Sequence, residues 1–224
     1  ETEICNVEQT SLIYPGYEIA DLAANATFEE VAYLLLVGDK PTADQLDSFK
    51  SDLVAERSLP QPVVDFLKTS GDLVNNQYAV PMDILRTAVS IQAHVDADCQ
   101  DNAPEANLRK AKRLLAKIPT IIGHMQNSIE GKDFVAPRDD LSHSANLLYM
   151  MTGEEPTPEA EKVMDVSLVL YAEHDYNAST FTSRVITGTL ADMHGGVTGA
   201  IAALKGKLHG GANEAAMDML SDIR

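Results

Sequence analysis

The sequence predicts an all-α fold with a short β-hairpin at its N-terminus, for three reasons. Aromatic residues make up only 5% of the 224 residues and tryptophan is absent, so leucine, valine, isoleucine, alanine and methionine must form the core, which suits packed helices. Capping boxes and prolines mark many helix starts. Only residues 4–18 carry β-forming residues around a polar turn, as in a hairpin.

Local signals predict where the first helices begin and end. Thr27 and Glu30 form a capping box in front of the apolar run Val31–Val37, because each side chain can satisfy a backbone N–H group of the first turn. Gly38 follows this run, and glycine often ends a helix because it adopts the left-handed conformation without steric cost. A second capping box begins at Thr42.

Prolines divide the middle of the chain. The prolines at 60–62 break the chain before a short helix over residues 63–67. Pro81 begins the next helix and Pro104 begins a long one. Pro119 lies inside this long helix and predicts a kink or a break there, because proline lacks the backbone donor.

The last third is also expected to be helical. Residues 131–137 form a loop, and a helix follows over Leu141–Met151. Thr157 as N-cap and Pro158 at the first helical position begin another helix. Gly195–Ala203 is rich in glycine and alanine, which lets helices approach closely. No repeat, low-complexity segment or domain linker interrupts the sequence.

Composition excludes several classes of protein. Hydrophobic residues make up 45% of the chain, which excludes a disordered acidic tail, and the net charge of −17 disfavours binding to nucleic acids or anionic membranes. No apolar run approaches the ~18 residues of a membrane helix, and no signal peptide is visible. Cys5 and Cys99 follow no disulfide pattern, so a cytoplasmic location is expected.

The chain shows no metal-binding pattern and no nucleotide-binding loop. None of its histidines belongs to an HExxH or CxxC motif, so no metal is expected. The basic residues of the run 109–117 are interpreted as a solvated helix face rather than a phosphate site. The six histidines are His94, His124, His143, His174, His194 and His209.

Two of these histidines have unusual neighbours. His174 ends a mostly apolar helix and is followed by polar residues that include Asn177; this cluster is either a binding site or the side-chain cap of a helix end. His209 precedes Gly210 and Gly211, which let the backbone approach a ligand. The alternative there is a turn between helices with an exposed histidine.

Five segments span nearly the whole chain in this order: Phe28–Leu36 with Gly38 and Pro41, Pro81–Thr87, Pro137–Ser142, Ala172–Arg184 without 175–176, and Leu204–Glu214. Together they resemble the citrate synthase family. The resemblance implies a multi-helix large domain of the citrate synthase type, and for the intact protein the condensation of oxaloacetate with acetyl-CoA to citrate and free CoA.

The resemblance also implies roles for single residues. His174 matches the histidine that binds oxaloacetate, and His209 matches the catalytic histidine that hydrogen-bonds the thioester carbonyl while the enol forms. Asn177 and Asn213 are expected to shape the substrate pocket. The implied partners are oxaloacetate, acetyl-CoA as co-substrate and a second copy in a homodimer, with no tightly bound cofactor.

Several features of the family are missing. The third histidine, the catalytic aspartate and the arginines that clamp the dicarboxylate have no counterpart, and a dianion needs such partners. We therefore expect a fragment, with residues 1–211 in an incomplete large helical domain and 212–224 beginning a smaller one. This chain alone is expected to be inactive.

Two alternatives remain open. The stretch 167–184 also resembles 2-methylcitrate synthases, which use propionyl-CoA, and Tyr171 stands where many citrate-forming members have a histidine. One methylene group changes binding by only ~1–3 kcal/mol, so a single side chain can decide this choice. The other alternative is a non-catalytic helical dimerisation fragment, in which Gly195–Ala203 pairs with a second subunit rather than within its own.

Overall fold

The computed structural model describes residues 4–7 and 11–211, and within them it confirms the mainly helical fold. The strands lie near the N-terminus: β1 (Asn6–Val7), β2 (Leu12–Tyr14) and β3 (Tyr17–Glu18). The expected hairpin is formed by β2 and β3, which turn at Gly16 with φ +79°. The strand β1 adds a third antiparallel strand, which the sequence pattern did not distinguish.

The next three helices are α1 (Ile19–Asn25), α2 (Phe28–Val37) and α3 (Ala43–Ala55). Both predicted capping boxes are confirmed, at the starts of α2 and α3. Gly38 ends α2 with φ +99°, in the left-handed conformation.

The middle helices are α4 (Gln61–Asn75), α5 (Pro81–Gln92) and α6 (Pro104–Ile129). The expected short helix at 63–67 is thus 15 residues long. Of the kink or break expected at Pro119, the break is wrong, because the 26-residue helix α6 continues through this proline. Pro119 is buried, and packing against neighbouring helices offsets the missing backbone hydrogen bond.

The last helices are α7 (His143–Thr152), α8 (Pro158–Tyr171), α9 (Ala178–Thr187) and α10 (Met193–Leu204). The helix expected from Leu141 begins two residues later, because Ser142 is its N-cap. Thr157 caps α8 as expected, accepting a hydrogen bond from the backbone nitrogen of Ala160 at 3.2 Å.

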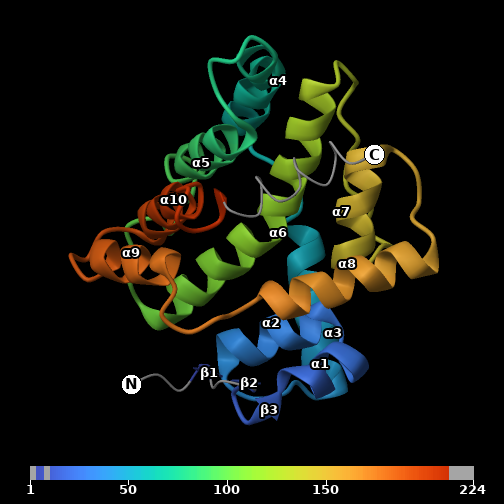
Figure 1. Cartoon of the computed structure of the whole chain (residues 1–224), viewed down its shortest axis with the longest axis vertical. Helices are drawn as coiled ribbons and strands as arrows, with labels where there is room; N and C mark the ends of the chain where they lie inside the picture. Colours follow the sequence, from blue (N-terminus) through green and yellow to red (C-terminus); the bar gives the residue numbers. More distant parts are fainter. Residues whose placement is uncertain (1–3, 8–10, 212–224) are drawn as a thin grey trace.

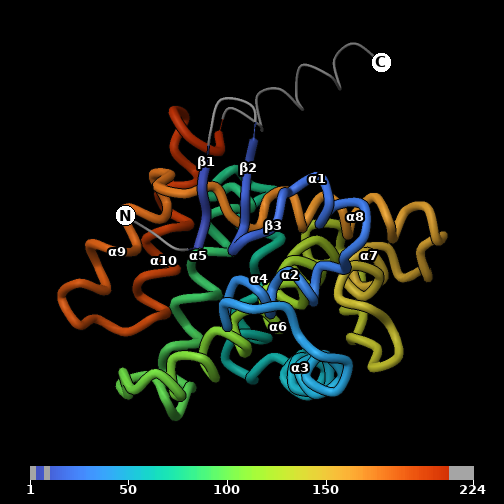
Figure 2. The backbone as a smooth tube through the Cα atoms, turned by 90° about the horizontal axis from the view of Figure 1, so that it is seen from below, coloured from blue at the N-terminus to red at the C-terminus, as the bar shows by residue number. Residues whose placement is uncertain are grey.

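The long helix α6 runs through the middle of the molecule, with α4 and α5 on one side and α7 on the other (Figure 1). The sheet lies beside α1, at the edge away from α3 (Figure 2). Tyr14, Leu22, Val31, Leu34 and Phe49 belong to a first buried core near the sheet. A second buried core is formed by α4, α5, α6 and α10. No helix in the described part of the chain has the length and apolar character needed to cross a membrane.

The basic residues of α6 do not form the expected solvated face. Lys110 is fully buried, and its Nζ donates hydrogen bonds to the backbone oxygens of Cys99 and Asp101. The interpretation of the basic run 109–117 as a solvated helix face was wrong, because acidic residues from the loop before α6 and from the end of α3 fold onto this helix. The resulting ion pairs are Arg109–Asp98, Lys112–Asp52, Arg113–Asp96, Arg113–Asp98 and Lys117–Glu56.

Candidate active site

The helices α9 and α10 pack against each other at glycines. A Cβ atom on Gly199 would lie 2.2 Å from Cδ1 of Ile186, and one on Gly196 would lie 2.8 Å from Cγ2 of Thr187. A side chain at either position would force Ile186 or Thr187 to shift, so glycine favours this close approach. The predicted role of Gly195–Ala203 in close helix packing is confirmed, and these contacts lie within one chain.

His209 lies in the turn after α10 and touches the first turn of α9. Its Nε2 is 2.9 Å from Oγ of Ser179, and the same Oγ is 3.0 Å from the backbone oxygen of Ala200. A serine hydroxyl has a single proton, so His209 and Ala200 compete for it. Ser179 thereby holds the orientation of the half-buried imidazole, and which of the two groups receives its proton depends on the tautomer of His209.

The two glycines after His209 are explained by the turn itself. A Cβ atom on Gly210 would lie 2.5 Å from the backbone oxygen of Leu204. The backbone nitrogens of His209 and Gly211 both donate to the oxygen of Gly206, at 2.9 and 3.2 Å. The alternative of a tight turn therefore accounts for the glycines, and contact between this backbone and a ligand stays a prediction.

His174 is exposed and lies in the loop between α8 and α9, three residues after the end of α8 rather than on it. Tyr14 holds this loop, because its buried hydroxyl group lies 3.0 Å from the oxygen of Val169 and accepts from the backbone nitrogen of Glu173 at 3.2 Å. The backbone nitrogen of His174 donates to Oε1 of Glu173.

Asn177 is the N-cap of α9, and its Oδ1 accepts a hydrogen bond from the backbone nitrogen of Thr180 at 2.9 Å. The capping interpretation is therefore correct for this residue, and its role in binding substrate stays a prediction. Asn213 and the expected domain boundary at 211–212 depend on residues outside the described part of the chain.

Among the described residues, His174 and Asn177 come just before the first turn of α9, and His209 contacts that turn. His174 lies three residues before Asn177, which limits their Cα atoms to about 11 Å, and His209 reaches the second residue of α9. The N-terminus of a helix carries a partial positive charge and free N–H groups. Two imidazoles beside such a terminus form an environment for a small anion.

Cations near this end of α9 are few among the described residues. Arg184 lies over the ring of Tyr176, 4.9 Å from its centroid. Lys205 is neutralised by Asp83 of α5, with both carboxylate oxygens 2.7 Å from its Nζ. Lys207 is exposed and forms no ion pair within residues 4–7 and 11–211. The absence of a full dicarboxylate clamp from 165–214 stays a prediction.

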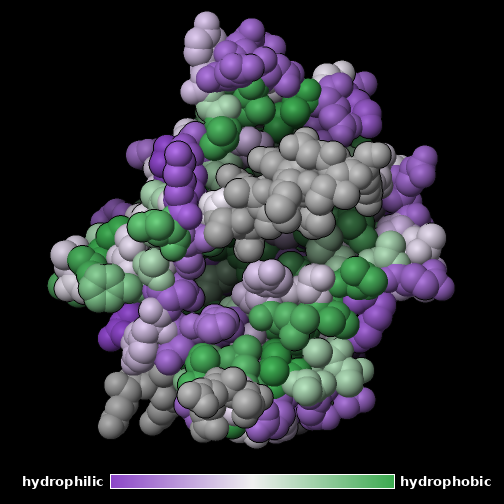
Figure 3. Space-filling model, viewed as in Figure 1, coloured by the Kyte–Doolittle hydropathy of each residue, from purple (hydrophilic) through white to green (hydrophobic). Residues whose placement is uncertain are grey.

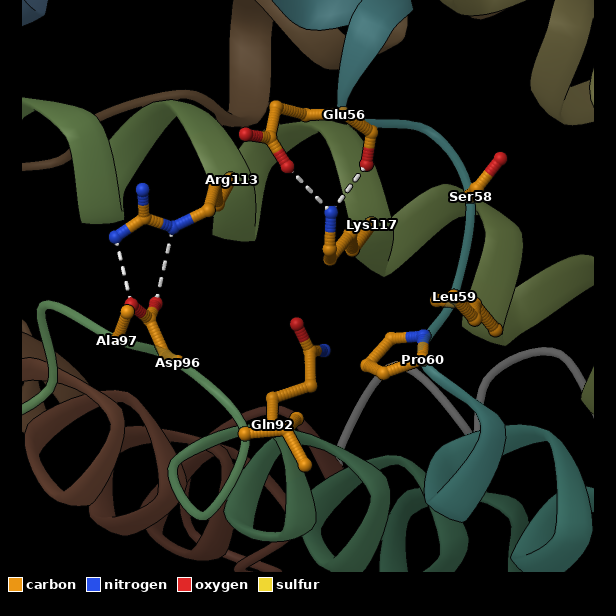
Figure 4. Close-up of a pocket in the computed structure, with 10 residues that line it drawn as sticks. Glu56, Ser58, Leu59, Pro60, Gln92, Asp96, Ala97, Arg113 and Lys117 are labelled. Carbon is orange, nitrogen blue, oxygen red and sulfur yellow. Dashed lines mark hydrogen bonds and ion pairs between the residues drawn. The ribbon is translucent and has the colours of Figure 1, made fainter.

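A separate cavity of about 380 Å³ lies between α5, α6 and the loop before α4 (Figure 4). Arg113 faces Asp96, and Lys117 faces Glu56, across its wall. Gln92 points into the space between them. Both cations are paired, and none of the predicted site residues lines this cavity.

One group of potential metal ligands occurs in the described part of the chain, although no motif predicted it. Cys99, Asp192 and His194 each offer a ligand atom, and these three atoms lie within 4.8 Å of one another. Sequence spacing could not reveal this group, because the loop before α6 and the start of α10 meet only in the fold.

Comparisons with known proteins agree with this fold. A family model described as citrate synthase, C-terminal domain, matches residues 1–224. The chain is 44% identical to a citrate synthase of Deinococcus radiodurans and 45% identical to a 2-methylcitrate synthase of Shewanella oneidensis, in each case over 97% of this chain and 56% of the relative. A citrate synthase from Thermoplasma acidophilum, solved with carboxymethyl coenzyme A and oxaloacetate, superposes with a TM-score of 0.89, at 28% identity, over all of this chain and 58% of the other.

The fold is the largely helical fold of solved citrate synthases. The chain belongs to the citrate synthase family. It spans a little over half the length of the curated relatives it matches. Ser179 is the residue of this site that sequence reasoning missed: it was only part of a polar cluster, and its contact with His209 depends on the packing of α9 against α10.

Proposed function

We propose that the protein containing this chain condenses oxaloacetate with acetyl-CoA, giving citrate and free CoA. The observation that carries the proposal is the 2.9 Å contact between Ser179 and His209 in a member of the citrate synthase family. Oxaloacetate, an acyl-CoA and water are then the reactants, and no tightly bound cofactor is required.

His209 acts on the thioester. Removal of the weakly acidic α-proton leaves negative charge on the thioester oxygen, and a positioned donor stabilises that charge. A neutral His209 donates from Nδ1 when that nitrogen carries the proton, and its Nε2 then accepts a hydrogen bond from a neighbouring donor. The hydroxyl of Ser179 is that donor when it turns from Ala200 to His209.

Two further steps complete the proposed reaction. The enol carbon attacks the ketone carbon of oxaloacetate and forms the new C–C bond, and water then cleaves the thioester and releases CoA. In the citrate synthase family that this chain resembles, an aspartate removes the α-proton. That aspartate has no counterpart in this sequence. General base catalysis of this kind increases the reaction rate by a factor of about 10²–10⁴.

His174 and Asn177 contribute to binding of oxaloacetate in this proposal. The N-terminus of α9 attracts a carboxylate, and the exposed imidazole of His174 is available for a second hydrogen bond. The Thermoplasma acidophilum relative was solved with oxaloacetate and a CoA derivative, which supports this substrate class. In this proposal residues 1–211 belong to an incomplete large helical domain, and residues 212–224 begin a smaller one that would complete the pocket.

A citrate-forming enzyme is the first candidate, and a 2-methylcitrate synthase is the second. The second candidate is supported by the 45% identity to the 2-methylcitrate synthase of Shewanella oneidensis. Steady-state kinetics with acetyl-CoA and propionyl-CoA separate them: a higher kcat/KM for propionyl-CoA would replace the first candidate by the second.

The decisive experiment measures free thiol released from acetyl-CoA in the presence and absence of oxaloacetate. A protein extended to the length of its relatives should release thiol only with oxaloacetate, and His209→Ala should abolish this release. The same change at the exposed His94 is the matched control. The 224-residue chain by itself should be inactive, and oxaloacetate-dependent release from it would overturn that part of the proposal.

A homodimer in the cytoplasm completes the proposal. Apolar side chains gather over α8 and α9 on one face (Figure 3), including Val163, Tyr171, Phe181 and Val185, which are 56–79% exposed. A monomer whose measured mass does not change with concentration would argue against the dimer. If the full-length protein forms a stable dimer but releases no thiol from acetyl-CoA, the alternative of a non-catalytic dimerisation module is favoured.

A further inference from the structure

Three potential metal ligands meet where the loop before α6 touches the start of α10, away from the residues assigned to the condensation. Cys99 comes from this loop, Asp192 is the N-cap of α10, and His194 is the second residue of α10. Cys99 is 7% exposed and His194 is 1% exposed. Sγ of Cys99, a carboxylate oxygen of Asp192 and a ring nitrogen of His194 lie within 4.8 Å of one another.

His194 has a free nitrogen directed into this group. Its Nδ1 is buried and has no hydrogen-bond partner among the described residues, and it lies 4.0 Å from Oδ1 of Asp192. Buried polar atoms without a partner are rare and call for an explanation. An ion at Nδ1 would supply the missing partner.

The other nitrogen of His194 is oriented as in known metal sites. Nε2 lies 3.3 Å from Oδ2 of Asp96, so Nε2 carries the proton and Nδ1 presents its lone pair. Asp96 is itself held by two hydrogen bonds from Arg113, visible in Figure 4. Metal-binding histidines almost always donate their other ring N–H to a carboxylate, a backbone carbonyl or a water molecule, which fixes the tautomer in this way.

The remaining ligand atoms are available. Oδ1 of Asp192 accepts the backbone N–H of Gly195 at 2.8 Å, and Oδ2 has no hydrogen bond among the described residues. Sγ of Cys99 has only a weak contact with Nε2 of Gln100, at 3.7 Å. Ligand atoms of a tetrahedral zinc site lie about 3.5 Å apart, so a closure of about 1 Å would complete the geometry.

We propose that Cys99, Asp192 and His194 bind one zinc ion, with a water molecule at the fourth position. Thiolate, imidazole and carboxylate are the ligands that zinc accepts together, whereas magnesium and calcium prefer oxygen alone. One thiolate and one carboxylate balance the two positive charges of the ion, so the site is neutral in a place where little water reaches. The ion ties the loop before α6 to the start of α10.

The test titrates the protein, first freed of metal by a chelator, with Zn²⁺ alone and then with Co²⁺ alone. Wild-type protein should bind one equivalent of Zn²⁺, Mg²⁺ should not compete, and Co²⁺ should give thiolate-to-metal charge-transfer absorption. Cys99→Ala should weaken zinc binding by more than about 100-fold. Cys5→Ala is the matched control, because Cys5 is also buried and free but lies outside the group.

Asp192→Asn gives a second variant that keeps the helix start, because asparagine is also a good N-cap. It should weaken zinc binding by about 10-fold to 100-fold, and it decides the question if Cys99→Ala does not fold by circular dichroism. Absence of stoichiometric zinc binding by folded wild-type protein would overturn the proposal. So would cobalt spectra without thiolate absorption, or zinc binding that the Cys99 and Asp192 changes leave intact, since that would be surface binding.

Discussion

Oγ of Ser179 lies 2.9 Å from Nε2 of His209, although the two residues are 30 positions apart in the chain. This contact makes Ser179 a positioning residue for the proposed donor to the thioester. Ser179→Ala should lower kcat about 100-fold, because a misplaced catalytic group loses this much, and should leave KM for oxaloacetate nearly unchanged. Steady-state kinetics of the full-length protein measure this split. Ser167→Ala is the control, since that hydroxyl donates within its own helix. Activity within twofold of wild type would contradict the role.

Tyr14 ties the small sheet to the loop that carries His174. Tyr14→Phe removes the hydroxyl group and leaves the backbone N–H of Glu173 without its acceptor. The free energy of unfolding should fall by about 1–3 kcal/mol, the usual cost of an unsatisfied buried donor. Urea denaturation measures the loss, and Tyr78→Phe, at a residue 82% exposed, should cause none. Equal stability of the two variants would show that water replaces the hydroxyl at no cost.

Asp165 of α8 connects the starts of two other helices. Its buried Oδ1 accepts from the backbone nitrogen of Phe28 at 3.1 Å and from Oγ of Ser144 at 2.8 Å. Asp165→Ala should lower the free energy of unfolding by about 2–3 kcal/mol, because both hydrogen bonds go to a charged group. Asp165→Asn keeps an acceptor oxygen and should cost less. The prediction fails if denaturation curves give the reverse order.

His143 makes stability depend on pH. Burial, and then the positive charge of Arg57, lowers the pKa of His143 to about 4. The unfolded chain binds a proton at this residue below its ordinary pKa of about 6.5, while the folded protein does not. The stabilisation is therefore complete above pH 6.5 and is lost as the pH falls towards 4, by about 3 kcal/mol over this window.

The check compares unfolding free energies at several pH values in this window. His143→Gln should remove much of the decrease, and His94→Gln, at an exposed position, should leave it unchanged. Burial also lowers the pKa of His124 and His194, so a smaller decrease in the same direction should remain. An unaltered pH profile for His143→Gln would contradict the assignment.

Local signals in the sequence predicted the helix starts well. The capping boxes at Thr27 and Thr42 depend only on residues three positions apart, and so does the N-cap at Thr157. Such contacts form wherever the rest of the chain lies. The class of fold and the family followed from the same stretches of sequence.

Contacts between distant segments were the ones that sequence reasoning missed. Pro119 was expected to break α6, but burial among other helices keeps the helix continuous. Lys110 was expected in solvent, and it is buried because the loop before α6 supplies two backbone acceptors. The partner of His209 could not be predicted either, since Ser179 reaches it only after α9 packs on α10.

The glycine contacts between α9 and α10 join the two helices mechanically. With Gly196 and Gly199 filled by side chains of the opposite helix, sliding of one helix along the other would drive Ile186 and Thr187 into backbone. The glycine contacts therefore hold the two helices together as a pair. Because Ser179 lies on α9 and His209 lies in the turn after α10, these contacts also preserve the 2.9 Å distance between Oγ of Ser179 and Nε2 of His209.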